Sequence, residues 1–553
     1  MFQEFYGFTR LPFSRTIATQ DLFPTVGQKE LGARLAYLVR ERGVGLITGE
    51  IGCGKSTAVR AFAASLDFNR YLVVYLANPT TGMTGLYRDL VVSLGYEPPF
   101  SKPRLVARIR TALEDLSVTK HRAPVVVLDE AHQLPDTATL FFGEQLTAGQ
   151  IAELARDAEV AARTGAREVA ALPDAASGVG PAIRKLRLVF GEVPGKLAQR
   201  LAAEKEGFAE ALDELTVALD RLASELGLNA ERSEDIGNCA QRATDAVAQL
   251  ARWRAGLAES APEEGVPQVA WIRWVDVTHS GWQLHASPLT VADVFSKQVA
   301  ESGRSWVFTS ATLAVGGDFS LYQRELGLSD AGTWCWESPF DYESQALLYV
   351  PRDLPAPNSR EHTEAVVASV LPVLRASGGR AFLLFTTLRA LNVAREMLVD
   401  AFAREGLDWP LLVQGEGSRS ELLTRFRELG NAVLLGSASF REGVDVPGAA
   451  LSVVIIDKLP FAPPDDPLLA ARLEQLRAEG GNPFFDYQLP RAVIALKQGA
   501  GRLIRSETDR GVLMICDPRL TDKPYGKRIW RSLPPMRRTR ELNDVEAFLA
   551  EAR

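Results

Sequence analysis

Between residues 44 and 135, short apolar runs alternate with longer stretches in which apolar residues recur at helical spacing. The apolar runs have the length of strands and are rich in β-branched residues, as in VGLIT, YLVVYL and VVVL. Strands that alternate with amphipathic helices are typical of a parallel sheet covered by helices. A helical pattern at 28–41 precedes the first run. The pattern therefore predicts an α/β domain at the start of the chain.

The pattern changes after the third apolar run. Residues 153–257 are rich in Ala, Leu, Glu and Arg, and segments such as FAEALDELTVALDRLASELG carry apolar residues at the helical period. We interpret this stretch as a helical insertion with amphipathic packing. The turn-forming PEEGVP (262–267) ends it, and WIRWVDV, WQLHASPL and WVFTSATL then predict short strands.

A second series of alternating strands and helices fills the rest of the chain. Its predicted strands are LLYV, AFLLFTT, LLVQG, AVLLGS, LSVVIID and GVLMICD. None of them is followed by a phosphate-binding loop, which indicates a partner domain that closes over the first one. We expect a first domain from 1–149, the insertion at 150–262, completion of the first domain at 263–335, and the second domain at 336–553.

Composition and charge narrow the range of functions. The 553-residue chain is 46% hydrophobic and has a net charge of −7, so no overall positive field favours nucleic acid. The basic stretch 519–540 is a local candidate for such contact, and a solvated charged face is the alternative. The cysteines, Cys53, Cys239, Cys335 and Cys516, form no C-x-x-C pair, which indicates a reducing compartment. Without a signal-peptide core or about 18 consecutive apolar residues, we expect a cytoplasmic protein with no membrane contact.

Residues 49–57, GEIGCGKST, match the phosphate-binding pattern GxxxxGK[ST]. Its glycines let backbone N–H groups face phosphate oxygens, and its lysine adds a positive charge. A chance match is the alternative, but VGLIT before it and STAVRAFAASL after it supply the strand and helix that the motif needs. The residues that we expect at the nucleotide are Gly49, Gly52, Gly54, Lys55, Ser56 and Thr57.

The apolar run that starts at Val125 ends in two adjacent carboxylates, Asp129 and Glu130. The carboxyl ends of parallel strands are where α/β proteins bind phosphate ligands. Asp129 and Ser56 can hold Mg²⁺ from opposite sides, and Glu130 can then orient the attacking water. The sequence therefore predicts ATP and Mg²⁺ as cofactors, with Ser56 and Asp129 at the metal.

A second group of candidates lies in QGAGRLIR (498–505). Gln498, Arg502 and Arg505 are at helical offsets of four and seven, which places them near one face of a continuing helix. Arginines at that place can stabilise charge on a transferring phosphoryl group. The alternative is a surface salt bridge. Together with GSASFREGVDVPG (436–448), this stretch favours a domain that closes on the nucleotide.

Two family resemblances follow from these motifs. The first 134 residues, with FYGFTRLPFS and TGEIGCGKST, resemble the ExeA-like AAA+ ATPases. From Val125 to the C-terminus, DEAHQLPDTATLFFG, FTSATL, SFREGVDVPG, GGNPFFDYQLP and QGAGRLIR resemble, in the same order, the DinG/YoaA branch of the XPD-like superfamily 2 DNA helicases. The resemblance implies an α/β fold with two RecA-like parallel-sheet P-loop domains and a helical insertion in the first, which arches over DNA.

The helicase resemblance also implies roles for single residues. It places Ser310–Thr312 where hydrolysis is coupled to strand movement, Thr386 in the fourth motif, and Gly443 and the nucleotide-binding Asp445 in the fifth. The catalytic residues that it implies, from the DEAH box and the sixth motif, are Asp129, Glu130, His132, Gln498, Arg502 and Arg505. As substrate the resemblance implies single-stranded or forked DNA, along which the protein moves from 5′ to 3′. As partners it implies replication or repair proteins.

The chain departs from the helicase pattern in its first half. The family carries an AGTGTGKT-like first motif and a longer segment whose four cysteines hold an iron–sulfur cluster, whereas the stretch between Lys55 and Asp129 is short and ExeA-like. Arg441 also stands where the family has Trp. Since the cysteines of this chain lie on four distant segments, we expect no iron–sulfur cluster.

Three hypotheses compete. The chain is an ATP-dependent DNA helicase or translocase, or an ExeA-like AAA+ regulator of a protein or transposition partner, or a nucleotide-binding hybrid with no unwinding activity. The complete set of later helicase motifs favours the first. The sensor strand, bridging arginine and helical lid of an AAA+ module are not recognisable in the sequence, which counts against the second.

Overall fold

The computed structural model describes residues 25–49, 53–76, 82–98, 122–191, 194–257, 271–302, 304–336, 340–437 and 450–551, with isolated residues between these ranges. The described chain divides into two compact units. Unit 1 takes the described residues of 1–133, 295–461 and 484–553, and unit 2 those of 134–294 and 462–483. Each unit is built from segments that are distant in the sequence.

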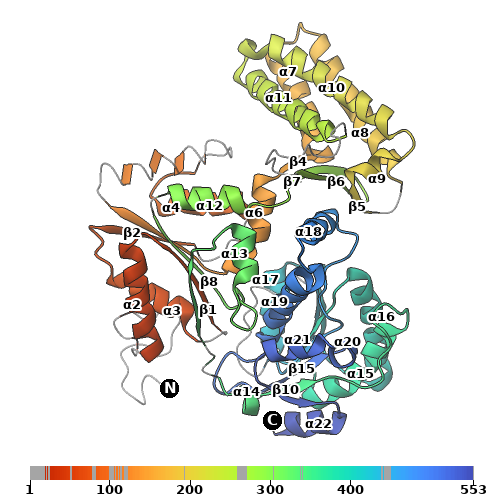
Figure 1. Ribbon diagram of the computed structural model, residues 1–553. Helices are drawn as coiled ribbons and strands as arrows, with labels where there is room; N and C mark the ends of the chain where they lie inside the picture. Colours follow the sequence, from red (N-terminus) through yellow and green to blue (C-terminus); the bar gives the residue numbers. More distant parts are fainter. Residues whose placement is uncertain are drawn as a thin grey trace. The chain divides into compact units, whose positions relative to one another are not determined.

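In the part of the chain that the structure describes, the first half of unit 1 contains a five-stranded parallel sheet (Figure 1). Its strands, in spatial order, are β2 (Tyr71–Leu76), β3 (Ala123–Leu128), β8 (Ser305–Ser310), β1 (Val44–Gly49) and β9 (Gly332–Trp336). The predicted parallel sheet is confirmed. β9 was not predicted, because a short edge strand with two exposed positions has no continuous apolar run.

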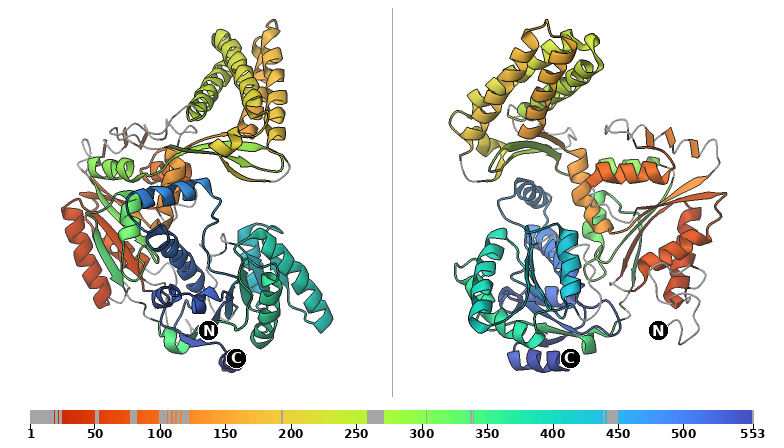
Figure 2. Two further views of the ribbon diagram at one scale, coloured as in Figure 1. Left: turned by 45° about the vertical axis from the view of Figure 1, so that its right-hand side comes forward. Right: turned by 180° about the vertical axis from the view of Figure 1, so that it is seen from behind.

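Helices lie on both faces of this sheet (Figure 2). α2 (Val26–Arg40) and α3 (Lys55–Ser65) pack together, and α2 begins with a capping box in which Thr25 and Gln28 exchange hydrogen bonds. On the other face, Phe295 of α12 (Ala292–Glu301) lies 6.2 Å from Phe308 of β8, measured between ring centroids. Other helices of this part whose bounds the structure describes are α4 (Gly82–Ser93), α13 (Ser320–Leu326) and the single turn η3 (Ala131–Gln133).

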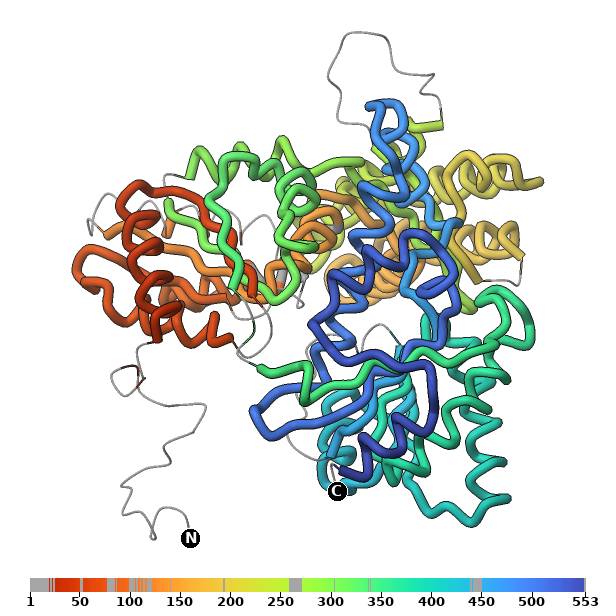
Figure 3. The backbone as a smooth tube through the Cα atoms, turned by 60° about the horizontal axis from the view of Figure 1, so that its bottom comes forward, coloured from red at the N-terminus to blue at the C-terminus, as the bar shows by residue number. Residues whose placement is uncertain are grey.

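Within the described residues, the second half of unit 1 is a seven-stranded sheet whose neighbours are all parallel. In spatial order the strands are β12 (Leu411–Val413), β13 (Val433–Gly436), β11 (Ala381–Leu384), β14 (Val453–Ile456), β15 (Gly511–Ile515), β10 (Ala346–Tyr349) and β16 (Arg537–Thr539). The six predicted strands are confirmed, and β16 is an addition within the basic stretch. Figure 3 traces the chain from β9 through α14 (Tyr342–Gln345) into β10.

Alternate residues of this sheet enter two separate cores. Phe382 and Leu384 of β11 belong to one buried cluster, and Leu383 between them belongs to the other. The first cluster includes residues of α17 (Arg419–Leu429), α19 (Leu489–Ala500), α20 (Arg519–Asp522) and α21 (Gly526–Ser532). The second includes residues of α15 (His362–Ser377), α16 (Leu388–Glu405) and α22 (Leu542–Ala550). The sheet is therefore covered by helices on both faces.

Unit 2 combines an antiparallel sheet with a group of long helices. Its described strands pair in the order β4 (Glu144–Thr147), β7 (Trp282–Pro288), β6 (Trp271–Val277) and β5 (Gly195–Ala198). The helices are α6 (Leu134–Phe142), α7 (Ala148–Gly165), α8 (Ala171–Val189), α9 (Gln199–Ala203), α10 (Phe208–Leu228), α11 (Glu234–Ala255) and α18 (Pro467–Ala478), with the turn η4 (Ala230–Arg232). Because the first segment of unit 2 (134–294) begins after β3 and ends before β8, it is inserted in the first sheet's domain.

The apolar stripe of α10 explains why this insertion is helical. Phe208, Leu212, Leu215, Leu219 and Leu222 recur every three or four residues and are almost fully buried against α8 and α11. Burying each such side chain contributes about 1.5–3 kcal/mol. The predicted amphipathic helices are confirmed.

The predicted segment boundaries need two corrections. Residues 271–288, which we expected to complete the first nucleotide-binding domain, form β6 and β7 of the antiparallel sheet in unit 2. Residues 462–483, which we expected in the second domain, also belong to unit 2, where Asp466 pairs with Lys196 at 2.6 Å. Neither exchange has a local sequence signal, because the partners on which a strand or a helix packs are set by tertiary structure. The other boundaries stay predictions.

Every helix among the described residues is too short or too polar to cross a membrane.

Candidate active site

The phosphate-binding loop connects β1 to α3. Gly49 is the last residue of β1 and Lys55 is the first of α3. Gly54, just before the helix, has a φ of 82°, a left-handed conformation that glycine adopts without strain. The Lys55 ammonium donates to the Gly49 carbonyl at 2.5 Å and lies 3.6 Å from the Cys53 sulfur. The predicted Thr57 is in the first turn of α3, and Gly52 lies outside the described residues.

A carboxylate from the neighbouring strand reaches this loop. Asp129 directly follows β3, and its Oδ2 accepts a hydrogen bond from the Ser56 hydroxyl at 2.7 Å. The Tyr75 hydroxyl, from β2, donates to the same oxygen at 2.5 Å. Burial, and then the negative charge of Asp129, raise the pKa of Tyr75, so the phenol keeps the proton that it donates. The two predicted metal-binding residues are thus in contact.

Tyr75 was missed in the sequence analysis. The available signal was a tyrosine hydroxyl one residue before the end of YLVVYL. This strand, β2, pairs in parallel with β3. The register could not be derived from sequence, so the contact between Tyr75 and Asp129 could not be predicted.

Glu130 has a strained backbone next to the phosphate loop. Its φ is 50°, which is uncommon for a residue with a side chain and is found preferentially at functional sites. Burial and the adjacent charge of Asp129 raise the pKa of the Glu130 carboxyl, while Arg502, Lys55 and Arg505 act in the opposite direction. A glutamate with a raised pKa close to cations has the properties of a general base.

His132 links this carboxylate to β8. Its Nδ1 lies 3.4 Å from Glu130 Oε2 and 2.7 Å from the Ser310 hydroxyl. The backbone N–H of Thr312 donates to the same Ser310 hydroxyl at 3.3 Å. The predicted DEAH histidine and the Ser310–Thr312 segment therefore lie in one hydrogen-bonded chain.

Gln498 connects the domain of the seven-stranded sheet to this series of hydrogen bonds. It is buried near the end of α19, and its Nε2 donates to the Thr312 hydroxyl at 3.4 Å. A side chain that follows the seven-stranded sheet thus contacts a segment that follows β8 of the five-stranded sheet. This contact joins the two halves of the predicted site.

The helical spacing assumed for the two arginines is wrong. α19 ends at Ala500 with Gly501 as its C-cap, so Arg502 and Arg505 lie in the turn and loop that follow. The backbone N–H of Arg505 is held by the Asp509 carboxylate at 2.8 Å. The positive charges of both guanidinium groups nevertheless act to lower the pKa of Glu130, so they are within electrostatic range of its carboxylate. These charges therefore come from a loop and not from a helix face.

The structure describes the predicted residue of the fourth motif but not those of the fifth. Gly443 and Asp445 lie outside the described residues. Thr386 donates its backbone N–H at 2.9 Å and its hydroxyl at 3.2 Å to Asp457, a buried carboxylate that the sequence analysis did not select. Burial raises the pKa of Asp457 to about 6. Thr386 is therefore tied to the end of β14.

The residues present fit a magnesium nucleotide. Mg²⁺ prefers hard oxygen ligands and commonly takes one or two from protein. Ser56 and Asp129 offer a hydroxyl and a carboxylate oxygen 2.7 Å apart. Among the described residues, no cluster of three or more His, Cys, Asp or Glu side chains could hold a metal ion without such a ligand.

The cysteines lie on separate elements. Cys53 precedes α3, Cys335 is exposed in β9, Cys516 is buried directly after β15, and Cys239 is buried in α11 of unit 2. Burial raises the pKa of Cys239 and of Cys516, which keeps these thiols protonated. The expectation that the chain holds no iron–sulfur cluster stays a prediction.

Two family models match parts of the chain. Residues 370–536 match a helicase C-terminal domain, and residues 39–158 match an AAA domain. The AAA match begins before β1 and continues beyond the DEAH segment.

Curated relatives are similar over most of the chain. The ATP-dependent DNA helicase YoaA of Escherichia coli (strain K12) is 41% identical over 474 residues, which cover 84% of this chain and 72% of that protein. YoaA of Haemophilus influenzae is 40% identical over 77% of this chain and 64% of its own length. The ATP-dependent helicase DinG of Mycobacterium tuberculosis is 37% identical over 53% of this chain and 44% of its length.

Solved structures share the fold. The chain known as XPD_APO matches with a TM-score of 0.54 and 14% identity, over 92% of this chain and 99% of its own. Xpd4 of S. tokodaii matches with a TM-score of 0.54 and 13% identity, over 93% and 99%. The predicted α/β architecture with two parallel-sheet domains is confirmed by these neighbours.

Proposed function

Because this chain belongs to the YoaA/DinG family of ATP-dependent DNA helicases, we propose that it hydrolyses ATP between its two parallel-sheet domains and uses the cycle to move on single-stranded DNA. The observation that carries the proposal is the hydrogen bond from Gln498 to Thr312. It connects the helix before the arginine loop to a segment that is itself bonded to His132 through Ser310. The site of hydrolysis and the second domain are thereby linked.

Each residue has a role that its position supports. Lys55 and the loop glycines bind the phosphates, and Ser56 and Asp129 hold Mg²⁺, which neutralises charge on the phosphate oxygens when bound. Glu130 accepts the proton of the attacking water. Arg502 and Arg505 stabilise the charge that develops on the transferred phosphoryl group.

Hydrolysis changes the charge that the arginine loop faces. With a triphosphate bound, the arginines are drawn towards it, and after phosphate release that attraction is lost. The hydrogen bond between Gln498 and Thr312 couples this change to both domains. Alternating attraction and release between two domains on one strand produces stepwise movement.

The DNA substrate and the direction of movement are proposed from the family resemblance. We expect the protein to move from 5′ to 3′ along single-stranded or forked DNA. We expect it to do so in the cytoplasm, with replication and repair proteins as partners. The net charge of −7 means that DNA contact depends on local basic surface. In the basic stretch, Arg519 is already paired with the buried Asp517 at 2.7 Å, so it is a poor candidate for that contact.

The experiment that tests the proposal is ATP turnover with and without single-stranded DNA. We expect turnover to rise when single-stranded DNA is added. Whatever strand displacement occurs should require a fork with a 5′ single-stranded tail if the direction is as proposed. Turnover that DNA does not change would contradict the proposal.

The AAA match over residues 39–158 favours a second candidate, an ATPase that acts on a protein or transposition partner. The same assay separates the two. The second candidate predicts ATP turnover that single-stranded DNA leaves unchanged. It also predicts that Gln498→Ala has no effect, because an AAA regulator does not use the helicase C-terminal domain in its nucleotide site.

A further inference from the structure

The sheet order determines on which side of the phosphate loop the nucleoside lies. β3 and β8 are on one side of β1, and β9 is on the other. Asp129 and Glu130 follow β3, so the terminal phosphate of a bound nucleotide faces that side. The opposite end of the triphosphate, which carries the sugar and base, must then extend towards the carboxyl end of β9.

The residue at that end of β9 is Trp336. It is the direct strand partner of Gly49. A methyl group built on Gly49 would lie 3.1 Å from Trp336 Cβ and 2.9 Å from the Cys53 sulfur. The tryptophan therefore sits against the start of the phosphate loop.

The indole extends from there towards the start of α2. A methyl group built on Gly27 would lie 3.3 Å from the indole Nε1. The side chain is half-buried, so part of its surface remains accessible. An accessible aromatic surface next to a phosphate site is suited to stack on a base.

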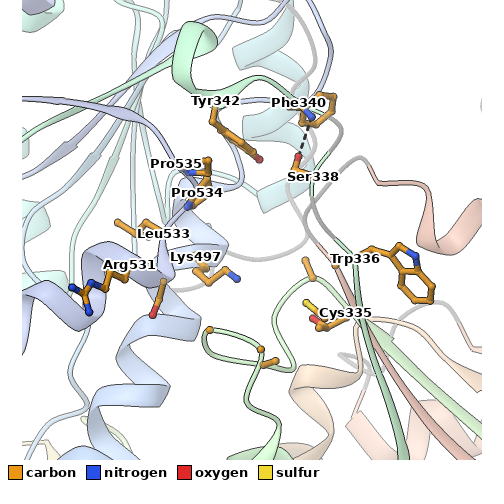
Figure 4. Close-up of a pocket in the computed structure, with 17 residues that line it drawn as sticks. Cys335, Trp336, Ser338, Phe340, Tyr342, Lys497, Arg531, Leu533, Pro534 and Pro535 are labelled. Atoms are coloured by element: carbon orange, nitrogen blue, oxygen red, sulfur yellow. Dashed lines mark hydrogen bonds between the residues drawn. The ribbon is translucent and has the colours of Figure 1, made fainter. Parts of the chain in front are cut away.

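Trp336 lines both hollows that adjoin the phosphate loop. The larger is a cavity of about 470 Å³, within the range of about 300–1,000 Å³ for small-molecule sites. Figure 4 shows Cys335, Trp336 and Ser338 on one side of this cavity and Lys497, Leu533 and Pro534 on the other. The smaller hollow, about 30 Å³, is lined by Gln28, Cys53, Lys55 and Trp336.

We propose that the Trp336 indole is the platform on which the nucleobase of ATP stacks, in the cavity that Lys497 lines on the opposite side. The inference rests on the proposed function, since it adds the base-binding residue to the same nucleotide site. Stacking requires only the π-face of the base. The residue therefore contributes affinity for the nucleoside and none for the triphosphate.

The chain offers a matched control. Trp334 lies two residues earlier on the same strand and therefore on the same face, also half-buried, but it pairs with Ile47 instead of Gly49. Both tryptophans pack against the same core cluster. Removing either indole takes away similar packing, but only Trp336 adjoins the phosphate loop.

The test compares Mg²⁺-ATP with Mg²⁺-tripolyphosphate by calorimetry on the full chain, in a Glu130→Gln background that blocks hydrolysis. We expect Trp336→Ala to weaken ATP binding by about 10- to 100-fold and to leave tripolyphosphate binding unchanged. Trp336→Phe should bind ATP within a few-fold of the parent, and Trp334→Ala should bind both compounds normally. In the hydrolysing chain, Trp336→Ala should raise KM for ATP more than it lowers kcat.

Two results would overturn the inference. In one, ATP binds Trp336→Ala as tightly as the parent. In the other, ATP and tripolyphosphate weaken together, which assigns Trp336 to holding the phosphate loop. Both differ from failure of the proposed function, in which the parent chain itself hydrolyses no ATP.

Discussion

Lys55 and Glu130 have separable roles at the residue scale. Lys55 contributes charge to nucleotide binding, and Glu130 acts on the attacking water only during hydrolysis. We expect Lys55→Ala to abolish ATP binding and turnover, and Glu130→Gln to retain binding while turnover falls by at least about 10²-fold. Calorimetry and phosphate release measure the two quantities. Equal, wild-type rates in both variants would remove these residues from the site.

The raised pKa of Glu130 makes turnover depend on pH. Only the ionised carboxylate can accept a proton, and the protonated fraction grows as pH falls through the raised pKa. The acid limb of kcat should therefore lie above the pH expected for an ordinary glutamate, whose pKa is 4.5. It is measured at saturating ATP, with circular dichroism at each pH to verify folding. Full turnover maintained down to that ordinary value would contradict the role.

Asp457 gives a pH effect on stability with a defined sign. Its pKa rises to about 6 on folding, so between about pH 4 and 6 the folded chain holds a proton that the unfolded chain releases. The bound proton stabilises the folded state at the low end of that range. This contribution to the free energy of unfolding is lost as the pH rises to 6. Above that pH, the buried charge of Asp457 costs on the order of 3 kcal/mol.

Asp457→Asn should remove this dependence. The Asn oxygen can still accept from the backbone N–H groups of Thr386 and Lys458, which both reach Asp457 Oδ1. We expect the variant to have a higher urea midpoint than wild type at pH 7.5, and a smaller advantage at pH 5. Asp457→Ala is the control, because it leaves those donors without their partner and should lower the midpoint at both values. An equal shift of the Asn variant at both pH values would contradict the assignment.

At the element scale, the loop after α19 is the part of the site that the second domain supplies. Replacing Arg502 or Arg505 with Ala should lower ATP turnover by about 10³-fold, the effect of removing an arginine that stabilises the transferred phosphoryl group. Lys523→Ala, an exposed cation in the same domain, should leave turnover unchanged. Circular dichroism checks the fold of each variant. Normal turnover in both arginine variants would mean that this loop does not act on the nucleotide.

The sequence predicted elements better than it predicted their partners. The loop from Gly49 to Thr57 and the carboxylates after β3 were recognisable because strand, turn and helix follow each other within a few residues. Tyr75 and Trp336 were not, since each reaches the phosphate loop through the order and register of strands far apart in sequence. The arginines were predicted on a helix face but lie in a loop, because no local signal showed that α19 stops at Ala500.

At the scale of the whole molecule, the chain passes between its two units four times. Unit 2 receives one segment from between β3 and β8 and a second from between β14 and α19. In unit 1, Phe461 and Phe484, which flank the second segment, lie 5.6 Å apart between ring centroids and both pack near Tyr525. Each sheet domain of unit 1 therefore has its own covalent connection to unit 2.

The last prediction is that the chain holds no iron–sulfur cluster. Such a cluster needs four thiolates at one inorganic core. In unit 1, Cys53 adjoins the phosphate-loop lysine at 3.6 Å, and Cys516 is enclosed in the second sheet's core. Recruiting Cys53 as a ligand would pull the loop from the nucleotide, and recruiting Cys516 would open that core. We therefore expect anaerobically purified protein to be colourless, without bound iron or sulfide.

The helicase resemblance implies that the cluster-bearing segment helps to split the duplex, so the predicted lack of a cluster has a functional consequence. We expect ATP turnover that single-stranded DNA stimulates, together with weak or absent strand separation on a forked duplex. One preparation serves for three measurements, so that the results are comparable: iron and sulfide content, ATP turnover and strand displacement. Stoichiometric iron and sulfide would show that the cysteines gather despite their positions. Efficient strand displacement without iron would show that unwinding by this chain needs no cluster.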